Sequence, residues 1–479
     1  MGASRCFSLS LRARSLLALS LALGCDSSSE VRTAARSADA GRESDSAAKP
    51  ELLALSRSGH DRFYGVTYDR SGSIYAVGQV TNSTDSDADT SLLLAKFTAA
   101  GQLDPSFESN GSLTRNVSRG RDGELFRGIV VQSGGKIVVA GTAEHLGPAD
   151  ARDRDIPVQR FNRDGTVDDT FGANGTVRID LSVGVANGAG FSTDSGWGLL
   201  RYADDRLVIS GSMVREGNLD TDFVLLRLLP DGLPDRTFGA NGVFVLDTQR
   251  NGASNDAIPR NVTLLPDGAG LLGTGSQPLP GGGTAPVLYK VTDTGVLDTS
   301  FGDNGVFSQS VLAQQTEIDA VALQPAADGG YKLVTIGSGR ALESETTDLI
   351  SLRLTPDGAL DPSYGDGGLV RVDIAGFADQ AHDLRVLPDG RLLFVGGAGV
   401  SAADVDGLVM ILTPDGAPDE SFAPGGFRTF DLGGSGDFFW GLALSNDAST
   451  AAIAGFEGVA NPSRSENDEA ALLLLPLSE

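Results

Sequence analysis

Short apolar runs bounded by glycine, proline, aspartate and asparagine recur along the chain from residue 50 onward. The runs are rich in β-branched residues, and no segment has the apolar period of 3.6 residues that is typical of a helix. In each repeat an acidic residue opens a first run, a tight turn leads to a second run ending in glycine, and a variable loop leads to a third. A stereotyped phrase then leads to a fourth run. The pattern predicts an all-β fold whose repeat contains four strands joined by turns.

The number of repeats predicts how the sheets close. The first run occurs seven times, but a fourth run follows a third run only six times, and the last repeat ends at 469–477 without one. The segment 50–59, "PELLALSRSG", precedes the first repeat in the place that fourth runs occupy elsewhere. Pairing this N-terminal strand with the last repeat would leave no open sheet edge. We therefore predict a seven-bladed β-propeller of four-stranded blades over 50–479, whereas the alternative, a linear solenoid, would leave both ends unpaired.

The stereotyped phrase is best read in "VTDTGVLDTSFGDNGVF", residues 291–307. Asp298 and Ser300 are placed to bond nearby backbone amides, and Gly302 and Gly305 allow backbone angles that a side chain would forbid. Phe301 is expected to pack between blades. It recurs as Phe107, Phe171, Phe238, Tyr364 and Phe422. We interpret the phrase as a structural corner that every blade needs, and not as a binding motif.

This phrase also resembles the "PDG-x-LD-x-SFG-x-x-G" phrase of the delta-60 repeat family. The resemblance covers 50–479, and the sixth copy departs from it with Ala423 and Pro424 where Gly-x-Asn is usual. The strongest matches are 97–111, 161–175, 228–242, 291–305 and 354–368. The resemblance implies an exported, propeller-like repeat protein and no particular activity.

The N-terminus has the pattern of a targeting segment. Three arginines precede the apolar run 15–24, which is too short to span a bilayer and ends at Cys25 in "LALGC". That ending resembles the lipobox of bacterial lipoproteins, with Ala22 where leucine is usual, and implies lipid attachment at Cys25. We assign 1–24 to a signal peptide and 25–49 to a disordered tether. The expected location is the cell envelope, anchored to a bacterial membrane by lipid; the alternative is a secreted or periplasmic protein.

Charge and cysteine content narrow the expected partners. With 37 basic and 63 acidic side chains, the net charge is −26, so like charge disfavours nucleic acid and anionic membrane surfaces. We expect a monomer that binds a protein or glycan at the cell envelope and touches the membrane only through its anchor. Cys6 would leave with the signal peptide, so the mature chain has no internal disulfide.

The variable loops lie on the propeller face opposite the stereotyped corners, where binding residues usually sit. One acidic residue opens each first strand on that face: Asp61, Glu124, Asp194, Asp256, Asp319, Asp379 and Asp437. These carboxylates could ring the channel mouth and bind a cation such as calcium. In the alternative reading, which the seven-fold repetition favours, each accepts hydrogen bonds from a neighbouring loop. We predict no other metal or cofactor.

A second column of residues breaks the repeat. Three residues after the leading acids, or four in the fourth repeat, stand Tyr64, Arg127, Trp197, Arg260, Ala322, His382 and Trp440. Aromatic groups with arginine could stack on a sugar or hold an anionic ligand near the channel mouth. The alternative is that they pack between blades.

No catalytic residue can be named from the sequence. The only histidines are His60, His145 and His382, and no nucleophile elbow, P-loop or dinucleotide fingerprint occurs. The preferred hypothesis is therefore a binding or interaction scaffold that acts through its variable acidic face. The alternative is an exported propeller enzyme, a hydrolase or lyase of polysaccharides, with carboxylates on that face.

Overall fold

The computed structural model describes residues 51–53, 59–81, 89–117, 123–146, 152–182, 192–214, 221–248, 257–279, 282–433, 435–458 and 468–477. By internal contacts the chain divides into Met1–Ala34 and Ala35–Glu479, and every described residue belongs to the second unit. The segments predicted as signal peptide and tether, with Cys25, lie outside the described residues.

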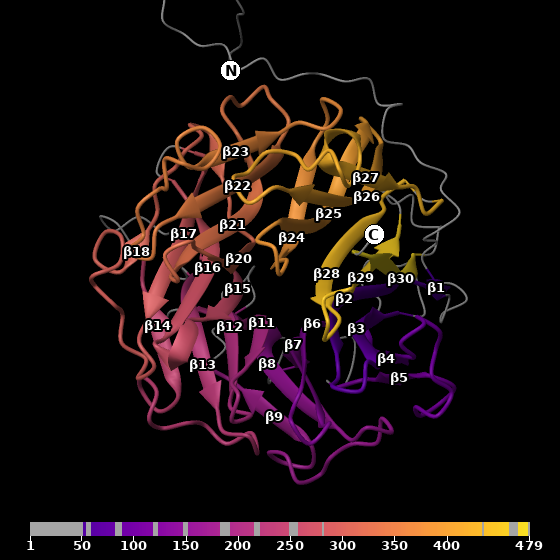
Figure 1. The fold of residues 1–479 in the computed structure, drawn as a ribbon. Coiled ribbons are helices and arrows are strands. Elements are labelled where there is room, and N and C mark those ends of the chain that lie inside the picture. Colours follow the sequence, from indigo (N-terminus) through magenta and orange to yellow (C-terminus); the bar gives the residue numbers. More distant parts are fainter. Residues whose placement is uncertain are drawn as a thin grey trace, which may run out of the picture. The chain divides into compact units, whose positions relative to one another are not determined.

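The second unit is a seven-bladed β-propeller, as the sequence predicts (Figure 1). Blade 1 consists of β2 (Asp61–Tyr68), β3 (Ile74–Val80), β4 (Ser91–Phe97) and β5 (Ser112–Arg115). Blade 2 consists of β6 (Glu124–Val131), β7 (Ile137–Leu146), β8 (Arg152–Phe161) and β9 (Thr176–Ile179). Blade 3 consists of β11 (Ser195–Arg201), β12 (Leu207–Val214), β13 (Thr221–Leu228) and β14 (Val243–Leu246). Blade 4 consists of β15 (Ile258–Leu264), β16 (Leu271–Pro278), β17 (Thr284–Val291) and β18 (Val306–Phe307). Blade 5 consists of β20 (Ala320–Pro325), β21 (Tyr331–Arg340), β22 (Asp348–Leu354) and β23 (Leu369–Val372). Blade 6 is β24 (Asp379–Val386), β25 (Leu392–Ser401), β26 (Asp404–Leu412) and β27 (Phe427–Phe430), and blade 7 is β28 (Phe438–Leu444), β29 (Thr450–Glu457), β30 (Glu469–Pro476) and β1 (Glu51–Leu53).

Minor elements complete the list. The strand β10 (Ser192–Thr193) pairs with β8, and β19 (Gln315–Thr316) pairs with both β17 and β21, so it joins blades 4 and 5. Two 3₁₀ turns are η2 (Pro266–Gly268) and η3 (Pro424–Gly426). Neither of these helical turns, in the part of the chain that the structure describes, has the length and hydropathy of a membrane-spanning helix.

The N-terminal strand closes the ring, which confirms the predicted closure. The strand β1 pairs antiparallel with β30, with Leu52 opposite Ala471. Beside it, the buried Asp468 carboxylate binds His60 and the guanidinium of Arg62, so the first and last blades are also joined by charge. The innermost strands contact one another in the order β2, β6, β11, β15, β20, β24, β28 and back to β2. A closed ring leaves no unpaired end blade.

The core lies between the blades and not at the axis. It consists of seven apolar clusters, one for each pair of adjacent blades. Alternation of side chains along a strand explains this: Leu271 packs toward blade 3 and its neighbour Leu272 toward blade 5. Strands buried on both faces read as continuous apolar runs, which is the pattern in the sequence.

The corner phrase has the structural role that the sequence predicts. Asp298 Oδ1 accepts the Ser300 N–H at 3.1 Å and the Ser300 hydroxyl at 2.6 Å. Phe301 is fully buried, and Gly302, with a φ of 52°, donates its N–H to the Asp357 carbonyl of the next blade at 2.8 Å. The sequence analysis missed that a basic residue of the third strand pairs with the corner aspartate. The pairs are Lys96–Asp104, Arg160–Asp168, Arg227–Asp235, Lys290–Asp298 and Arg353–Asp361.

Candidate functional site

A β-bulge in the innermost strands sets which side chains reach the propeller axis. In six of these strands the pairing shifts by one residue near the middle, for example between Phe63 and Gly65 or between Phe439 and Gly441. A bulged residue leaves the ladder and its side chain is re-aimed. In blade 5 the strand is interrupted between β19 and β20, and Asp319 lies in the gap, with its N–H bonded to the Ile336 carbonyl at 2.8 Å.

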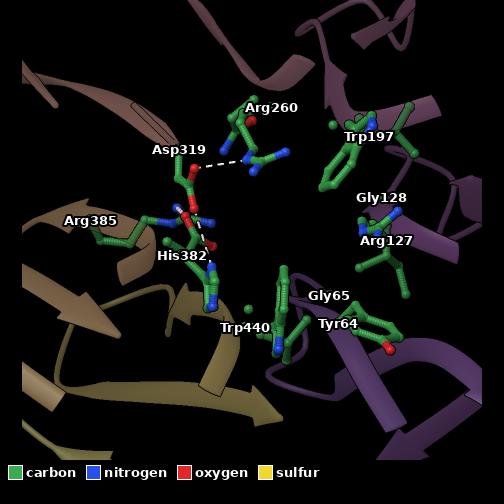
Figure 2. A pocket seen from close by; sticks show the side chains of 17 residues that line it. Tyr64, Gly65, Arg127, Gly128, Trp197, Arg260, Asp319, His382, Arg385 and Trp440 are labelled. Carbon is green, nitrogen blue, oxygen red and sulfur yellow. Dashed lines mark hydrogen bonds and ion pairs between the residues drawn. The ribbon is translucent and has the colours of Figure 1, made fainter. Parts of the chain in front are cut away.

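The seven residues at these positions, which we call the axial ring, line one cavity (Figure 2). They are Tyr64, Arg127, Trp197, Arg260, Asp319, His382 and Trp440. The structure therefore brings together all six residues that the sequence analysis singled out as ligand-binding candidates, although they come from six different blades. The cavity has a volume of about 150 Å³ and is open to solvent.

Each member of the axial ring contacts the member from the next blade. The Arg127 guanidinium lies 5.6 Å from the ring centroid of Tyr64 and 3.8 Å from that of Trp197. On the other side of Trp197, Arg260 lies 4.5 Å from the same centroid and forms an ion pair of 2.8 Å with Asp319 (Figure 2). These contacts connect the ring members from Tyr64 to Asp319.

The remaining contacts close the axial ring. Asp319 Oδ2 lies 3.2 Å from Nδ1 of His382. The His382 ring stacks on Trp440, and Trp440 meets the Tyr64 ring edge-on at a centroid distance of 5.4 Å. The axial ring thus contains three aromatic residues, three charged residues and His382, and every neighbouring pair in it interacts.

Small residues after the ring members let the strands approach the axis. Glycine follows Tyr64, Arg127, Trp197 and Trp440. A Cβ atom at Gly65 would lie 2.1 Å from the Arg127 carbonyl oxygen, closer than two atoms can pack. The narrow centre of the propeller therefore requires glycine here, because only a residue without a side chain allows neighbouring strands this close.

Blade 5 corrects two expectations. Ala322, expected in the aromatic column, packs against the apolar cluster between blades 5 and 6 instead. Asp319, expected among the leading acids, occupies the axial position because the strand is interrupted before it. Thr316 takes the place of the leading acid, and its buried hydroxyl accepts the Leu312 N–H at 3.1 Å. The signal that identifies the register is Ile318, which matches Phe63 and Phe439 as the apolar residue just before the axial position.

The other leading acids point away from the cavity. Asp61, Glu124, Asp194, Asp379 and Asp437 are at most 1 % exposed, and Asp256 lies outside the described residues. Glu124, Asp194, Asp379 and Asp437 accept backbone N–H groups from neighbouring loops and strands. The donors include Leu92 and Val117 for Glu124, Leu181 and Ser182 for Asp194, Ile374 and Gly399 for Asp379, and Leu432 and Gly458 for Asp437. These acids therefore accept hydrogen bonds from neighbouring segments, as in the second of the two readings of the sequence, and they do not line the cavity.

Three of these acids belong to carboxylate triads that repeat between blades. The triads are Asp155, Asp180 and Asp194; Asp348, Asp373 and Asp379; and Asp406, Asp431 and Asp437, each with oxygen atoms within 4.8 Å of one another. Burial raises the pKa of Asp379 to about 8 and that of Asp437 to about 7. Arg178 pairs with Asp155 and Arg371 with Asp348, whereas Thr429 holds the corresponding position in the third triad.

Electrostatics differ between the two arginines of the axial ring. Burial disfavours an ionised Asp319, but Arg260 and His382 more than offset this and hold the pKa of its carboxyl below the usual value. Arg127 has aromatic contacts and, in the part of the chain that the structure describes, no carboxylate at ion-pair distance. Burial lowers the pKa of Arg127 to about 10, and the nearby charges of Arg260 and Arg154 act in the same direction.

The carboxylates of the cavity are held in place. Apart from Asp319, the lining contains Asp383, which accepts the N–H of Leu384 at 2.8 Å and that of Leu442 at 3.0 Å. Arg385 donates to the same carboxylate at 2.6 Å. No serine or cysteine lies among the cavity residues that the structure describes. The arrangement can bind and orient a ligand.

Comparison with known proteins supports a propeller-repeat family. Residues 132–171, 203–238 and 387–422 match a family described as a domain of unknown function (DUF5122) beta-propeller. Each matched segment begins at the turn after an innermost strand and ends on the corner aromatic residue of its blade. No curated protein sequence matches the chain significantly.

Several solved structures are similar in fold. The alpha-L-arabinanase of Penicillium chrysogenum is 13% identical, with 74% of this chain and 93% of that chain covered and a TM-score of 0.42. Sqt1 of Chaetomium thermophilum is 12% identical, with 90% and 98% covered and a TM-score of 0.45. The alpha-L-arabinofuranosidase Arb93A of Fusarium graminearum is 10% identical, with 74% and 92% covered and a TM-score of 0.42.

Proposed function

We propose that this chain is a non-enzymatic binding module that takes its ligand in the cavity of the axial ring. The observation that carries the proposal is a set of buried polar atoms in that ring that have no hydrogen-bond partner among the described residues: Nε of Arg127, Nε2 of His382 and Nε1 of Trp440. Buried polar groups are almost always satisfied, and a cavity with a few convergent polar groups is the usual form of a small-molecule site. All three residues line the cavity, and a ligand that reaches these atoms would supply the missing partners.

The aromatic members favour polar recognition over stacking on a sugar. Trp197 lies between two guanidinium groups, and one face of Trp440 is covered by His382 at a centroid distance of 3.7 Å. A sugar stacks on an open aromatic face. Since the neighbours in the ring already use these faces, the proposed ligand is held by charged and polar groups.

The enzymatic alternative has less support. Glycoside hydrolysis uses two carboxyl groups, of which the general acid needs a raised pKa. The pKa of Asp319 is held low, and Asp383 is fixed by two backbone N–H groups and Arg385. Asp319 therefore lacks the raised pKa of a general acid, and both oxygen atoms of Asp383 already accept hydrogen bonds.

The proposal also covers the location of the protein, its family, its oligomeric state and the source of its ligand. It includes export, a lipid anchor at Cys25, membership of the delta-60 repeat family, a monomeric state, and a ligand from a protein or glycan of the cell envelope. The basis is the N-terminal pattern, the repeat phrase and the net charge of −26. Calcium is a possible ion of the acidic face, and it has no role in the proposed cavity.

Tryptophan fluorescence tests the proposal directly, because the protein has two tryptophans and both line the cavity. We expect a saturable change in emission with at least one member of a panel of sugars, sugar acids, organic acids and short peptides. Trp197→Phe and Trp440→Phe should each remove part of it. The ligand should be recovered unchanged by mass spectrometry. Conversion of a polysaccharide would overturn the binding-module proposal in favour of an enzyme, and no response to any class would overturn the site.

A further inference from the structure

We infer that the axial cavity recognises a small carboxylate, held by the guanidinium group of Arg127. This inference rests on the proposed function and names the ligand class of the same site. It follows from the charge of the cavity, from the environment of Arg127 and from the volume available.

The cavity carries one uncompensated positive charge in a strongly acidic protein. Its charged lining residues are Arg127, Arg260, Arg385, Asp319 and Asp383, which makes three positive and two negative groups, and His382 faces the same space. Arg260 pairs with Asp319 at 2.8 Å and Arg385 with Asp383 at 2.6 Å. The chain as a whole has a net charge of −26. A positive cavity in such a chain selects an anion by charge complementarity.

Once Arg260 and Arg385 are paired with carboxylates, Arg127 is the charged group of the cavity that remains. Arg127 is partly buried, and a charge that is removed from water is normally paired because its desolvation is costly. Within the described part of the chain, Arg127 contacts the faces of Tyr64 and Trp197, and its buried Nε atom has no hydrogen-bond acceptor. Cation–π contacts hold the guanidinium in place but leave its N–H donors without oxygen atoms. The planar fork of N–H groups matches the two oxygen atoms of a carboxylate.

Volume and charge favour a carboxylate over a phosphate. A cavity of about 150 Å³ takes a group of roughly the size of benzene, so it accepts a small organic acid or the acidic end of a sugar acid. One surplus positive charge balances a carboxylate, which is a monoanion at neutral pH. A phosphate monoester carries roughly −1.5 to −2 and would remain undercompensated.

The test is a calorimetric titration of the purified protein with acetate, D-glucuronate, D-glucuronamide and inorganic phosphate. D-Glucuronamide has the shape of D-glucuronate without its charge. We expect acetate and D-glucuronate to bind, and D-glucuronamide and phosphate to bind at least about tenfold more weakly than D-glucuronate. Acetate binding equal to that of D-glucuronate would identify a small organic acid as the source, and preferential binding of D-glucuronate would identify a sugar acid.

Two variants and one control locate the binding group. Arg127→Met should weaken D-glucuronate binding by about tenfold or more, and Arg127→Lys, which keeps the charge but loses the fork, should weaken it less. Arg70→Met, at an exposed position outside the cavity, should bind like the parent. Thermal unfolding shows whether Arg127→Met is folded, and Arg127→Lys provides the second measurement if it is not.

The outcomes separate this inference from the proposed function. Equal binding of D-glucuronate and D-glucuronamide, tighter binding of phosphate, or unchanged binding by both Arg127 variants would overturn the carboxylate inference. If only a neutral ligand of the fluorescence panel binds, the inference fails and the proposed function stands. If no ligand binds, both fail.

Discussion

The imidazole ring of His382 lies flat against the indole ring of Trp440, with centroids 3.7 Å apart and an angle of 5° between the planes. Nδ1 of the same imidazole lies 3.2 Å from the Asp319 carboxylate. His382 therefore joins the charged pair of Arg260 and Asp319 to the aromatic pair of Trp440 and Tyr64. Because these residues come from three consecutive blades, the contact also ties the blades together at their narrow end.

Replacing His382 should separate its two contacts. His382→Phe keeps an aromatic ring against Trp440 but removes the hydrogen bond to Asp319, so we expect the free energy of unfolding to fall by about 1 kcal/mol. His382→Ala also loses the ring contact and should cost about 2 kcal/mol. Urea unfolding followed by tryptophan emission measures both. Equal losses in the two variants would show that the stacking on Trp440 contributes nothing.

Asp319→Asn should weaken the fold and strengthen anion binding. The change removes the carboxylate that pairs with Arg260, so we expect a loss of about 2 kcal/mol in unfolding free energy at pH 7. Since the pKa of Asp319 is depressed, its contribution is present above about pH 4 and is lost as the pH falls through the folded-state pKa. The cavity gains a second uncompensated positive charge, so D-glucuronate should bind several-fold more tightly. Calorimetry that finds weaker binding would contradict the assigned charge balance.

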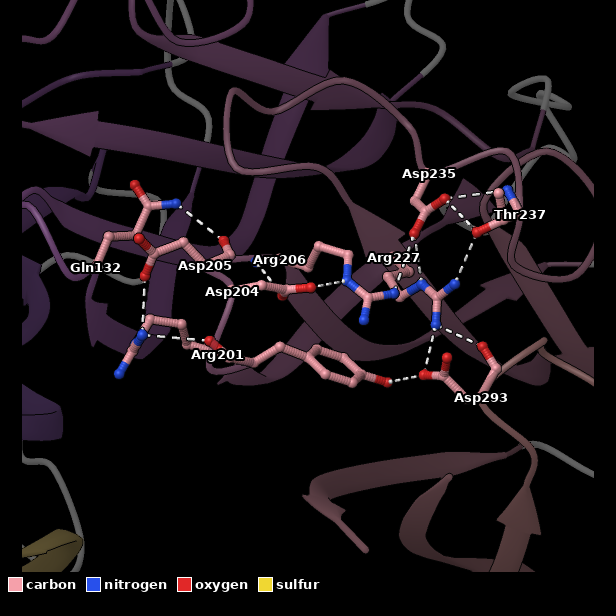
Figure 3. A network of polar contacts seen from close by, with 10 residues as sticks. Gln132, Arg201, Asp204, Asp205, Arg206, Arg227, Asp235, Thr237 and Asp293 are labelled. Atoms are coloured by element: carbon pink, nitrogen blue, oxygen red, sulfur yellow. Dashed lines mark hydrogen bonds and ion pairs between the residues drawn. The ribbon is translucent and has the colours of Figure 1, made fainter. Parts of the chain in front are cut away.

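The buried corner arginine of blade 3 should be among the most sensitive positions. Arg227, 1 % exposed, donates to Asp235 at 2.8 Å, to Thr237 at 3.0 Å and to the carbonyl and carboxylate of Asp293 (Figure 3). Arg227→Met leaves Asp235 buried without this partner and should cost about 3–5 kcal/mol. Lys290→Met removes the more exposed equivalent in blade 4 and should cost about 1 kcal/mol or less. Similar losses in urea unfolding would mean that burial does not set the strength of these pairs.

The pH dependence of stability should contain a contribution from Asp379. Burial raises its pKa to about 8, against N–H donation by Ile374 and Gly399, which acts to lower it. A raised pKa stabilises the fold fully below about pH 4, and this contribution is lost as the pH rises toward 8. Asp379→Asn should therefore flatten the fall in unfolding free energy between pH 5 and 8. Asp447→Asn is the control, because the Ser445 hydroxyl helps lower the pKa of Asp447 to about 2, outside that range; parallel curves for all three proteins would refute the assignment.

The third carboxylate triad should accept the arginine that two other triads contain. Arg178 and Arg371 pair with Asp155 and Asp348, and Thr429 holds the equivalent position opposite the strand of Asp406. We expect Thr429→Arg to raise the unfolding free energy by about 1 kcal/mol at pH 8, where repulsion in the triad is greatest. Thr429→Met adds comparable apolar length without charge. The interpretation fails if thermal unfolding shows the two variants to be equally stable.

The sequence by itself determined the architecture, because strand pattern and turn chemistry are local properties. Seven first runs, six fourth runs and an unpaired segment before the first repeat specified a propeller closed by its own termini, and β1 on β30 confirms it. Phe301 and the corner around Asp298 were predictable for the same reason, since each blade repeats one local geometry. The residues of the axial column were recognisable because they vary where the repeat does not.

Only the tertiary structure decided what those columns do. A shift of one residue in a strand moves a side chain to another face, so the interrupted strand of blade 5 places Asp319, and not Ala322, at the axis. The sequence left open that the recurring acids ring the channel mouth, but apart from Asp319 those that the structure describes are buried away from the cavity. Likewise, the pairing of Arg260, and the lack of a carboxylate partner for Arg127 among the described residues, depend on contacts between blades far apart in sequence. Such contacts follow from packing around the axis, which no local pattern encodes.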